Sequence, residues 1–275
     1  MASGSRSRPS SFPPGSSVSD YYRVEGLVRL SEGRMYSLVN DHRPDRTSKR
    51  CWECGHEDNS QRHGNCDSCG ASLAVRRFLL STRWDKHGFD PYLAFFQKQI
   101  AHPALLAPCD VFQWPDDHPN QLCSVVPYNG ETFLLDEAAP LPLQRVVRFA
   151  QRACGMLGML SYNGIKLAWL NRSNFLLRPN GDIMLFDPEV QAVSDAPLSV
   201  DDTRPVVMEL GELLRRYTPI EEREWQQFFL EAERGAFATP AEFGRALQIE
   251  AHHERAKANT IHAGTTQASR NLAPF

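Results

Sequence analysis

The chain has 275 residues, 41% of them hydrophobic, and a formal net charge of −3, so it can form one large domain or two modest ones with a substantial core. The nearly balanced charge gives no general attraction to nucleic acid or to anionic membranes. Apolar runs stay well short of the roughly 18 residues of a membrane span, and the N-terminus lacks the apolar core of a signal peptide, so we expect a cytoplasmic protein without a membrane part.

The first part of the chain is expected to be a disordered tail followed by strands. Residues 1–19 are rich in Ser, Pro, Gly and Arg and show no apolar periodicity, which favours disorder. Alternating stretches at Tyr22–Leu30 and Met35–Val39 predict two strands joined by a hairpin turn at Gly33. A further strand is expected over Leu73–Ser81.

The rest of the chain changes from short strands to helices. Asp90-Pro91 opens a helix expected to run to Ile100, since proline suits a first helical turn. Apolar residues at helical spacing predict one buried face on a helix over Leu141–Leu160. The other expected elements are two strands, three helices and a flexible tail: Val111–Trp114, Cys123–Val126, 206–216, 221–233, the helix from the capping box at Thr239 to about Glu250, and 251–275.

Four of the seven cysteines form two C-x-x-C pairs, each followed by glycine: Cys51 with Cys54, and Cys66 with Cys69. Two cysteines on such a tight turn can point both sulfurs at one metal ion, and the glycine permits the positive φ that the turn needs. Two pairs complete the closed four-thiolate shell of one structural zinc ion, so the pattern is typical of a zinc ribbon. A rubredoxin-like iron site and disulfides are the alternatives; the lack of an export signal favours the metal.

The charge of this ribbon disfavours binding to nucleic acid. Four acids lie between Cys51 and Gly70 against the single arginine Arg62, and four thiolates on Zn²⁺ add further negative charge. A face that binds phosphates needs the opposite sign.

The segment Leu160–Glu189 combines a helix end, a loop and a hairpin at a characteristic spacing. Leu160-Ser161-Tyr162-Asn163-Gly164-Ile165 is followed by Leu167-Ala168-Trp169, by Asn174 five residues after Trp169, and, after a hairpin, by Asp187-Pro188-Glu189. This order resembles, without a gap, the Leu-His-x-x-Gly-Ile, His-Arg-Asp, Asn and Asp-Phe-Gly of protein kinases. Shorter resemblances at His102–Leu106 and Leu210–Leu214 extend the likeness over about residues 22–250.

The resemblance implies an α+β, two-lobed protein-kinase-like fold. Its N-lobe and hinge would span residues 20–140, with the zinc ribbon inserted at 49–72, and its helical C-lobe would span 141–250. The order of expected elements, with strands, one helix, more strands and then mostly helices, agrees with this interpretation.

In the same frame, the residues that perform phosphoryl transfer are missing. Trp169 stands at the position of the catalytic Asp, and an indole has no basic lone pair; we expect it to pack as an apolar plug. The phosphate-pairing lysine has no lysine counterpart, and its glutamate partner is missing. Arg77, or Arg76 in a shifted register, could stand at the lysine position; the alternative is that both are surface arginines on an edge strand. Asn174 and Asp187, metal ligands in active kinases, remain as a vestigial nucleotide and Mg²⁺ site, or as a loop cap and a turn residue.

The leading hypothesis is therefore a pseudokinase: a protein without enzyme activity that binds protein partners in signalling as a scaffold or allosteric regulator, stabilised by one structural zinc ion. Two alternatives stay open. The first is an atypical kinase-fold enzyme with weak ATP-dependent phosphoryl or nucleotidyl transfer, and the second is a nucleic-acid adaptor that works through the ribbon.

Overall fold

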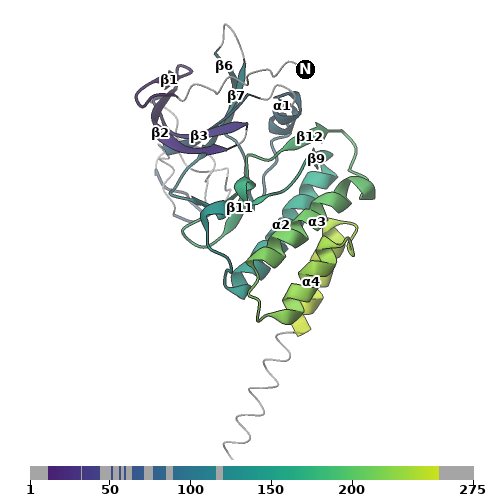
Figure 1. The fold of residues 1–275 in the computed structure, drawn as a ribbon. Helices are drawn as coiled ribbons and strands as arrows, with labels where there is room; N and C mark the ends of the chain where they lie inside the picture. The colour runs from purple at the N-terminus through teal and green to yellow at the C-terminus, as the bar shows by residue number, and fades with distance from the viewer. Residues whose placement is uncertain are drawn as a thin grey trace, which may run out of the picture. The chain divides into compact units, whose positions relative to one another are not determined.

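The computed structural model (Figure 1) describes residues 12–31, 33–43, 51, 56, 59, 64–70, 77–84, 89–115 and 120–253. The chain is α+β, as expected, and divides into two compact units. The first joins Met1–Glu137 to Asn163–Pro197, and the second joins Ala138–Tyr162 to Leu198–Phe275. The segment 163–197, which the resemblance assigns to a helical lobe over 141–250, thus groups with the strand-rich unit.

The first unit is built on a six-stranded antiparallel sheet of order β1-β2-β3-β4-β7-β6. The expected hairpin is confirmed, with Gly33 at a φ of 74° in its turn. The fourth strand runs later than the expected Leu73–Ser81, and residues 73–76 lie outside the described part. The strands are β1 (Ser17–Val18), β2 (Tyr22–Ser31), β3 (Arg34–Asp41), β4 (Arg77–Arg83), β6 (Asp110–Trp114) and β7 (Gln121–Pro127).

The expectation of a disordered tail over 1–19 is wrong for its last residues. Ser17 and Val18 form β1 by pairing with Arg23 and Tyr22, and Val18 is fully buried. The backbone partners and the apolar site come from β2, so the composition of the tail gave no sign of them. Residues 1–11 lie outside the described part.

A helix and two smaller sheets complete the first unit. The helix α1 (Phe89–Gln97) is shorter at its end than expected. One sheet has the order β5-β11-β10-β8 and mixes parallel and antiparallel pairs, and β9 pairs with β12 in the other. The remaining elements are β5 (Leu105–Leu106), β8 (Thr132–Phe133), β9 (Ile165–Leu167), β10 (Phe175–Leu177), β11 (Ile183–Phe186), β12 (Val190–Val193) and the short 3₁₀ helices η2 (Leu134–Asp136) and η3 (Arg172–Asn174).

One hydrophobic cluster joins the six-stranded sheet to the sheet of β11. Side chains alternate between the two faces of a strand, so Tyr36, Leu79 and Val126 point to one face of the large sheet, while their neighbours pack on the other. The ring of Tyr36 lies 5.3 Å from Phe133 and 5.5 Å from Phe186, centroid to centroid. This contact fixes the end of β11, where the candidate site begins.

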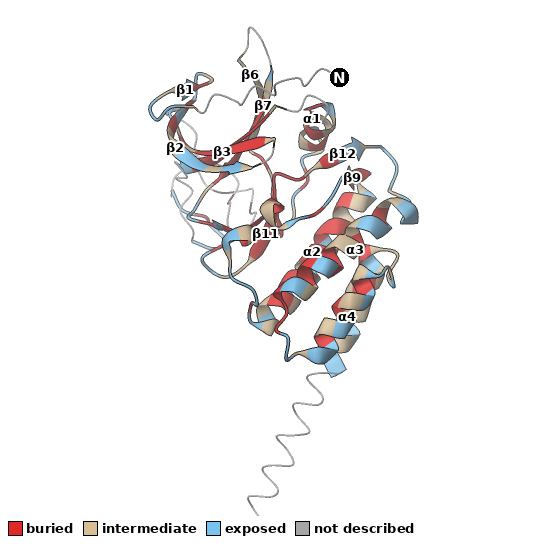
Figure 2. Cartoon of the chain, in the orientation of Figure 1, coloured by how far each residue is buried: buried red, intermediate tan, exposed pale blue. Residues whose placement is uncertain are grey.

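The second unit is helical. The helix α2 (Leu143–Tyr162) buries its predicted apolar face, including Val146 and Leu157 (Figure 2). At the expected capping box, the Glu242 backbone N–H donates to Thr239 Oγ1 at 3.2 Å, and the Glu242 carboxylate accepts from the Ala238 backbone N–H. The other helices are α3 (Val200–Tyr217), α4 (Arg223–Glu233) and a helix over 240–253. The expectation of a flexible tail over 251–275 is therefore wrong for residues 251–253, and residues 254–275 lie outside the described part.

Close contact between α3 and α4 depends on a small residue. A Cβ atom added at Gly211 would lie 2.5 Å from the backbone N of Glu233.

Among the described helices, none has the length and apolarity required to cross a membrane.

Candidate functional site

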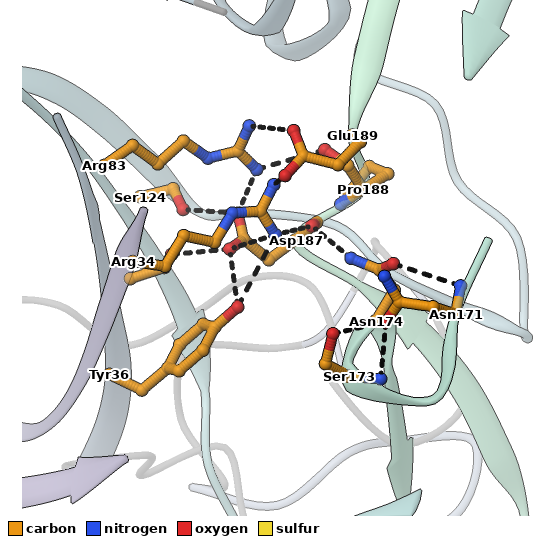
Figure 3. A network of polar contacts seen from close by, with 11 residues as sticks. Arg34, Tyr36, Arg83, Ser124, Asn171, Ser173, Asn174, Asp187, Pro188 and Glu189 are labelled. Carbon is orange, nitrogen blue, oxygen red and sulfur yellow. Dashed lines mark hydrogen bonds and ion pairs between the residues drawn. The ribbon is translucent and has the colours of Figure 1, made fainter. Parts of the chain in front are cut away.

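Asp187 begins the candidate site and occupies an unusual backbone conformation. It follows β11 directly, is only 1% exposed, and has a φ of 44°, which non-glycine residues rarely adopt. Such a conformation costs free energy and persists only when surrounding contacts hold it. The neighbouring Phe186 ring in the core supplies one such contact, and a polar network supplies the others (Figure 3).

Two buried arginines from neighbouring strands bind the Asp187 carboxylate. Arg34, the first residue of β3, places Nη1 3.1 Å from Asp187 Oδ2 and donates to the Asp187 backbone carbonyl at 2.9 Å. Arg83, the last residue of β4, donates through Nη2 to Asp187 Oδ1 and to the Pro188 carbonyl, the latter at 3.0 Å. Arg34 and Arg83 are direct cross-strand partners, so Asp187 lies between two like charges and pairs with both.

Three hydroxyl groups from the same face of the sheet complete the surroundings of the carboxylate. Ser81 Oγ donates to Asp187 Oδ2 at 2.5 Å, and the Tyr36 hydroxyl donates to the same oxygen at 3.3 Å. Ser124 Oγ donates to Oδ1 at 3.4 Å. Both carboxylate oxygens are therefore occupied by donors of the protein itself.

Glu189 closes the network as a second acid. Its carboxylate pairs with Arg34 Nη2 and lies 3.7 Å from Arg83 Nη1 (Figure 3). Its side chain is 25% exposed, so it faces solvent in part. We call Arg34, Arg83, Asp187 and Glu189 the ion quartet; its two acids and two arginines have no net charge.

The ion quartet changes the acidity of its members. Burial alone would raise the pKa of the Asp187 carboxyl, but the charges of Arg34 and Arg83 and the hydrogen bonds from Ser81 and Arg83 outweigh burial and lower it well below its usual range. Burial, followed by the negative charge of Asp187, raises the pKa of Tyr36, so this hydroxyl stays a donor. The carboxylate of Asp187 is thus ionised and held by fixed cations.

An aromatic ring contacts the quartet from α1. Tyr92 is fully buried, and the guanidinium carbon of Arg83 lies 3.8 Å from its ring centroid. A guanidinium over an aromatic face is attracted by the negative charge density of the ring. The helix therefore meets the strand arginine through an aromatic ring, where the kinase resemblance would place a carboxylate.

The two residues expected to form a vestigial metal site lie together, but their side chains are used by the protein. Asn174 Nδ2 donates to the Asp187 backbone carbonyl at 3.3 Å, and Asn174 Oδ1 accepts from the Asn171 backbone N–H at 3.3 Å. Asn171 in turn caps η3 by accepting from the Ser173 backbone N–H. Asn174 ties this capped loop to the backbone of Asp187.

Arg77 is a surface residue, which agrees with the second of the two roles that the sequence left open for it. Its side chain is 64% exposed, and it lies 3.5 Å from Glu25 at the start of β4; Arg76 lies outside the described residues. The arginines that reach Asp187 are Arg34 and Arg83. Alternation offered a signal, because Ser81 and Arg83 share the strand face of the buried Leu79.

The expectation that Trp169 packs as an apolar plug is wrong. Its side chain is 47% exposed, and it lies in the loop between β9 and η3. The preceding residue, Ala168, donates its backbone N–H to the Glu189 carbonyl at 2.7 Å. The loop is thus held at Ala168 and at Asn171, and Trp169 lies between these points in contact with solvent.

The cysteine cluster brings three of the four predicted ligands together. The sulfurs of Cys51, Cys66 and Cys69 all lie within 4.8 Å of one another, and Cys51 Sγ is 3.5 Å from Cys69 Sγ. Neighbouring sulfurs in a tetrahedral shell with Zn–S distances of about 2.3 Å lie roughly 3.8 Å apart. The set therefore fits a metal ion such as zinc; Cys54 lies outside the described residues.

The turn after Cys66 has the geometry that a metal-binding turn requires. Gly70 adopts a φ of 73°, as the sequence predicts for the glycine after a C-x-x-C pair, and donates its N–H to the Cys66 carbonyl. The Ser68 backbone N–H donates to Cys66 Sγ at 3.4 Å. Asn59 donates to the His56 carbonyl, which also accepts from the Cys51 N–H, and accepts from the Asp67 N–H, so it links the surroundings of Cys51 to those of Cys66.

No protein-family model matches the chain, and no curated protein is similar enough to count as a relative. The function therefore has to be argued from the ion quartet and the cysteine cluster.

Proposed function

We propose that this chain is a kinase-like protein without catalytic activity, which binds protein partners in signalling as a scaffold or allosteric regulator and is stabilised by one zinc ion in its ribbon. The observation that carries the proposal is the binding of the Asp187 carboxylate by Arg34 and Arg83. Both carboxylate oxygens accept from protein groups, and two fixed positive charges lie where an active kinase would need a divalent cation.

Electrostatics opposes metal binding at this carboxylate. A Mg²⁺ ion needs oxygen ligands at about 2.0–2.1 Å in octahedral geometry, so it would have to displace Arg34 or Arg83 from Asp187. The displaced guanidinium would lose its buried partner, at a cost of several kcal/mol by the usual behaviour of buried ion pairs. The internal arginines thus take the role of the counter-charge that a metal supplies elsewhere.

Two further positions support a loss of phosphoryl transfer. Trp169, at the place of the catalytic base, cannot accept a proton at neutral pH. Tyr92 of α1 contacts the Arg83 guanidinium through its aromatic ring. Among the described α1 residues, no carboxylate forms an ion pair with this arginine. The kinase-like, two-lobed fold itself is part of the proposal; the order of strands, helix, strands and helices and the spacing from Gly164 to Asp187 support it.

A thermal-shift measurement with Mg-ATP tests the absence of nucleotide binding. At a ligand concentration tenfold above Kd, binding would add about 1.4 kcal/mol to the stability and raise Tm by about 2–4 °C. We expect no shift with millimolar Mg-ATP or with Mg²⁺ alone. A clear shift that Asp187→Asn abolishes and Arg77→Ala retains would contradict the proposal and favour the atypical enzyme.

Partner binding is tested by capture from a lysate of the native source. An exposed tryptophan on a held loop is typical of the residues that dominate protein interfaces. We expect Trp169→Ala to reduce capture of the partner, whereas Ile220→Ala, at a residue 85% exposed in the second unit, leaves it unchanged. Equal capture by both variants would show that Trp169 does not contribute to partner binding.

A further inference from the structure

The three described cysteines of the cluster differ in their access to solvent. Cys51 and Cys66 are 1% and 4% exposed, whereas Cys69 is exposed. Its Sγ nevertheless lies only 3.5 Å from Cys51 Sγ. A small oxidant in solution therefore meets Cys69 before it meets either of the other two sulfurs.

We propose that Cys69 is an oxidation site, at which a hydroperoxide links Cys69 to Cys51 as a disulfide and releases the zinc ion. The inference rests on the zinc site of the proposed function. It adds that the metal is lost in a controlled reaction that begins at one defined ligand.

The reaction balances with hydrogen peroxide as the oxidant. The Cys69 thiolate attacks one peroxide oxygen, so that an S–O bond forms, the O–O bond breaks and the departing hydroxide takes up a proton to become water. The Cys51 thiolate then attacks the Cys69 sulfur of the sulfenic acid; the S–S bond forms, the S–O bond breaks, and a second hydroxide leaves and is protonated. Two thiolates, one peroxide and two protons give one disulfide and two waters.

The geometry favours this pair of cysteines. The Sγ atoms must approach from 3.5 Å to about 2.05 Å, a movement of about 1.5 Å between neighbouring turns. Disulfide sulfurs are no longer thiolates, and zinc binds cysteine as the thiolate. Oxidation of Cys69 and Cys51 would therefore remove two of the residues that would hold the ion.

The position of the ribbon in the fold limits the consequences to the ribbon itself. The ribbon leaves the sheet after β3 and returns at β4, and these strands pair directly at its base, where Asn40 lies opposite Arg77. The pairs from Arg34–Arg83 to Asn40–Arg77 do not depend on the metal. Oxidation therefore alters the ribbon surface while the sheet and the ion quartet remain folded, which suits a change in partner binding.

The test titrates the full chain, loaded with one equivalent of zinc, with hydrogen peroxide in the presence of a chromogenic zinc chelator. We expect zinc release in step with a Cys51–Cys69 cross-link in non-reducing peptide mapping, before half-buried Cys109 is oxidised. Reduction with dithiothreitol and added zinc should restore metal binding. Circular dichroism should show that the sheet and helices persist.

Two variants separate an oxidation site from general damage. Cys69→His removes the exposed thiol but offers a nitrogen ligand, so zinc release by peroxide should slow by about tenfold or more. Cys109→Ser, outside the cluster, should release zinc at the wild-type rate.

The outcomes distinguish this inference from the zinc site beneath it. Zinc that stays bound until Cys109 is oxidised, or a cross-link that lacks Cys69 or Cys51, overturns the oxidation site and leaves the zinc site standing. Protein purified without chelator that holds well under one equivalent of zinc overturns both.

Discussion

The ion quartet and the cysteine cluster both lie in the first unit, but they bring their groups together in different ways. The quartet uses two arginines of the chain itself, which reach Asp187 from positions 153 and 104 residues away. The cysteine cluster gathers its described sulfurs within a short stretch of chain, at distances that could hold a metal ion. The arginines already occupy both oxygens of the Asp187 carboxylate, whereas the three sulfurs can share one added ion.

The quartet and the ribbon also differ in what they contribute to the stability of the fold. The quartet connects Asp187 and Glu189 to the start of β3 and the end of β4, so the first unit cannot lose it without leaving charges buried and unpaired. The ribbon is an insertion between β3 and β4, and these two strands pair with each other directly. We therefore expect changes at the quartet to destabilise the fold far more than changes at the ribbon.

The largest expected effect is that of Asp187→Asn. The substitution leaves Glu189 as the one acid of the quartet against two buried arginines. The free energy of unfolding should fall by about 3–5 kcal/mol, as is typical when one partner of a buried ion pair is removed. Urea denaturation followed by tryptophan fluorescence measures the loss. Arg77→Ala, at an exposed ion pair of a strand that also carries Arg83, should change the stability by less than about 0.5 kcal/mol. Similar losses in the two variants would mean that the quartet does not stabilise the fold.

A smaller loss is expected for Ser81→Ala, which removes one hydrogen bond to Asp187 Oδ2. Hydrogen bonds to charged groups contribute about 1.5–3 kcal/mol, and Arg34 and Tyr36 still contact the same oxygen. The matched control is Ser37→Ala, at a buried serine on the adjacent strand whose hydroxyl lacks a hydrogen-bond partner among the described residues. Ser37→Ala should be neutral or slightly stabilising in the same urea series.

The free energy of unfolding should depend on pH under acidic conditions, because the Asp187 carboxyl titrates there. The pKa of Asp187 is lowered in the folded state, so its stabilisation is complete above the unfolded pKa of about 3.9 and is lost as the pH falls below that value. The free energy of unfolding of the wild type should therefore fall more steeply below about pH 4 than that of Asp187→Asn. Parallel curves for the two proteins would show that this carboxyl has the same pKa in both states.

The smallest effect on the fold is expected from removal of zinc. A strong chelator, or Cys66→Ser, should abolish metal binding and the hydrogen-exchange protection of the ribbon, because a ribbon of this size depends on its metal for folding. Protection of β3 and β4 should remain, since their backbone pairs do not involve the ribbon. Loss of protection across both strands would show that the ribbon and the sheet unfold together.

Local patterns in the sequence predicted many of the elements. The hairpin at Gly33, the buried face of α2 and the hairpin of β10 and β11 all follow from periodicity and turn residues within a few positions. The prediction failed for β1 and for the exposure of Trp169, because both depend on which distant segment lies next to them. A two-residue strand and a loop tryptophan carry no local sign of their neighbours.

The two sites also differ in whether local patterns or distant segments determine them. The spacing of Cys51 with Cys54 and of Cys66 with Cys69 is enough to predict a metal-binding set, since ligands three residues apart share one turn and the following glycine supplies its positive φ. The structure brings Cys51, Cys66 and Cys69 together and gives Gly70 this φ.

The sequence left two roles open for Asn174 and Asp187: a vestigial metal site, or a loop cap and a turn residue. The structure confirms the loop cap for Asn174, whose Oδ1 accepts from the Asn171 backbone N–H. The pairing of Asp187 with two arginines was not predicted, because the sequence around a carboxylate does not show whether it binds a metal or arginines.

The sequence by itself determined the strands and helices with strong periodicity and the set of cysteines, three of which the structure brings together. Only the tertiary structure decided that Arg34 and Arg83, rather than Arg77, meet Asp187. Strand register places these two arginines opposite each other at one end of the sheet. The packing of Phe186 against Tyr36 in the core positions the next residue, Asp187, between them. Electrostatic pairing depends on distance in space, and no spacing along the chain encodes that distance.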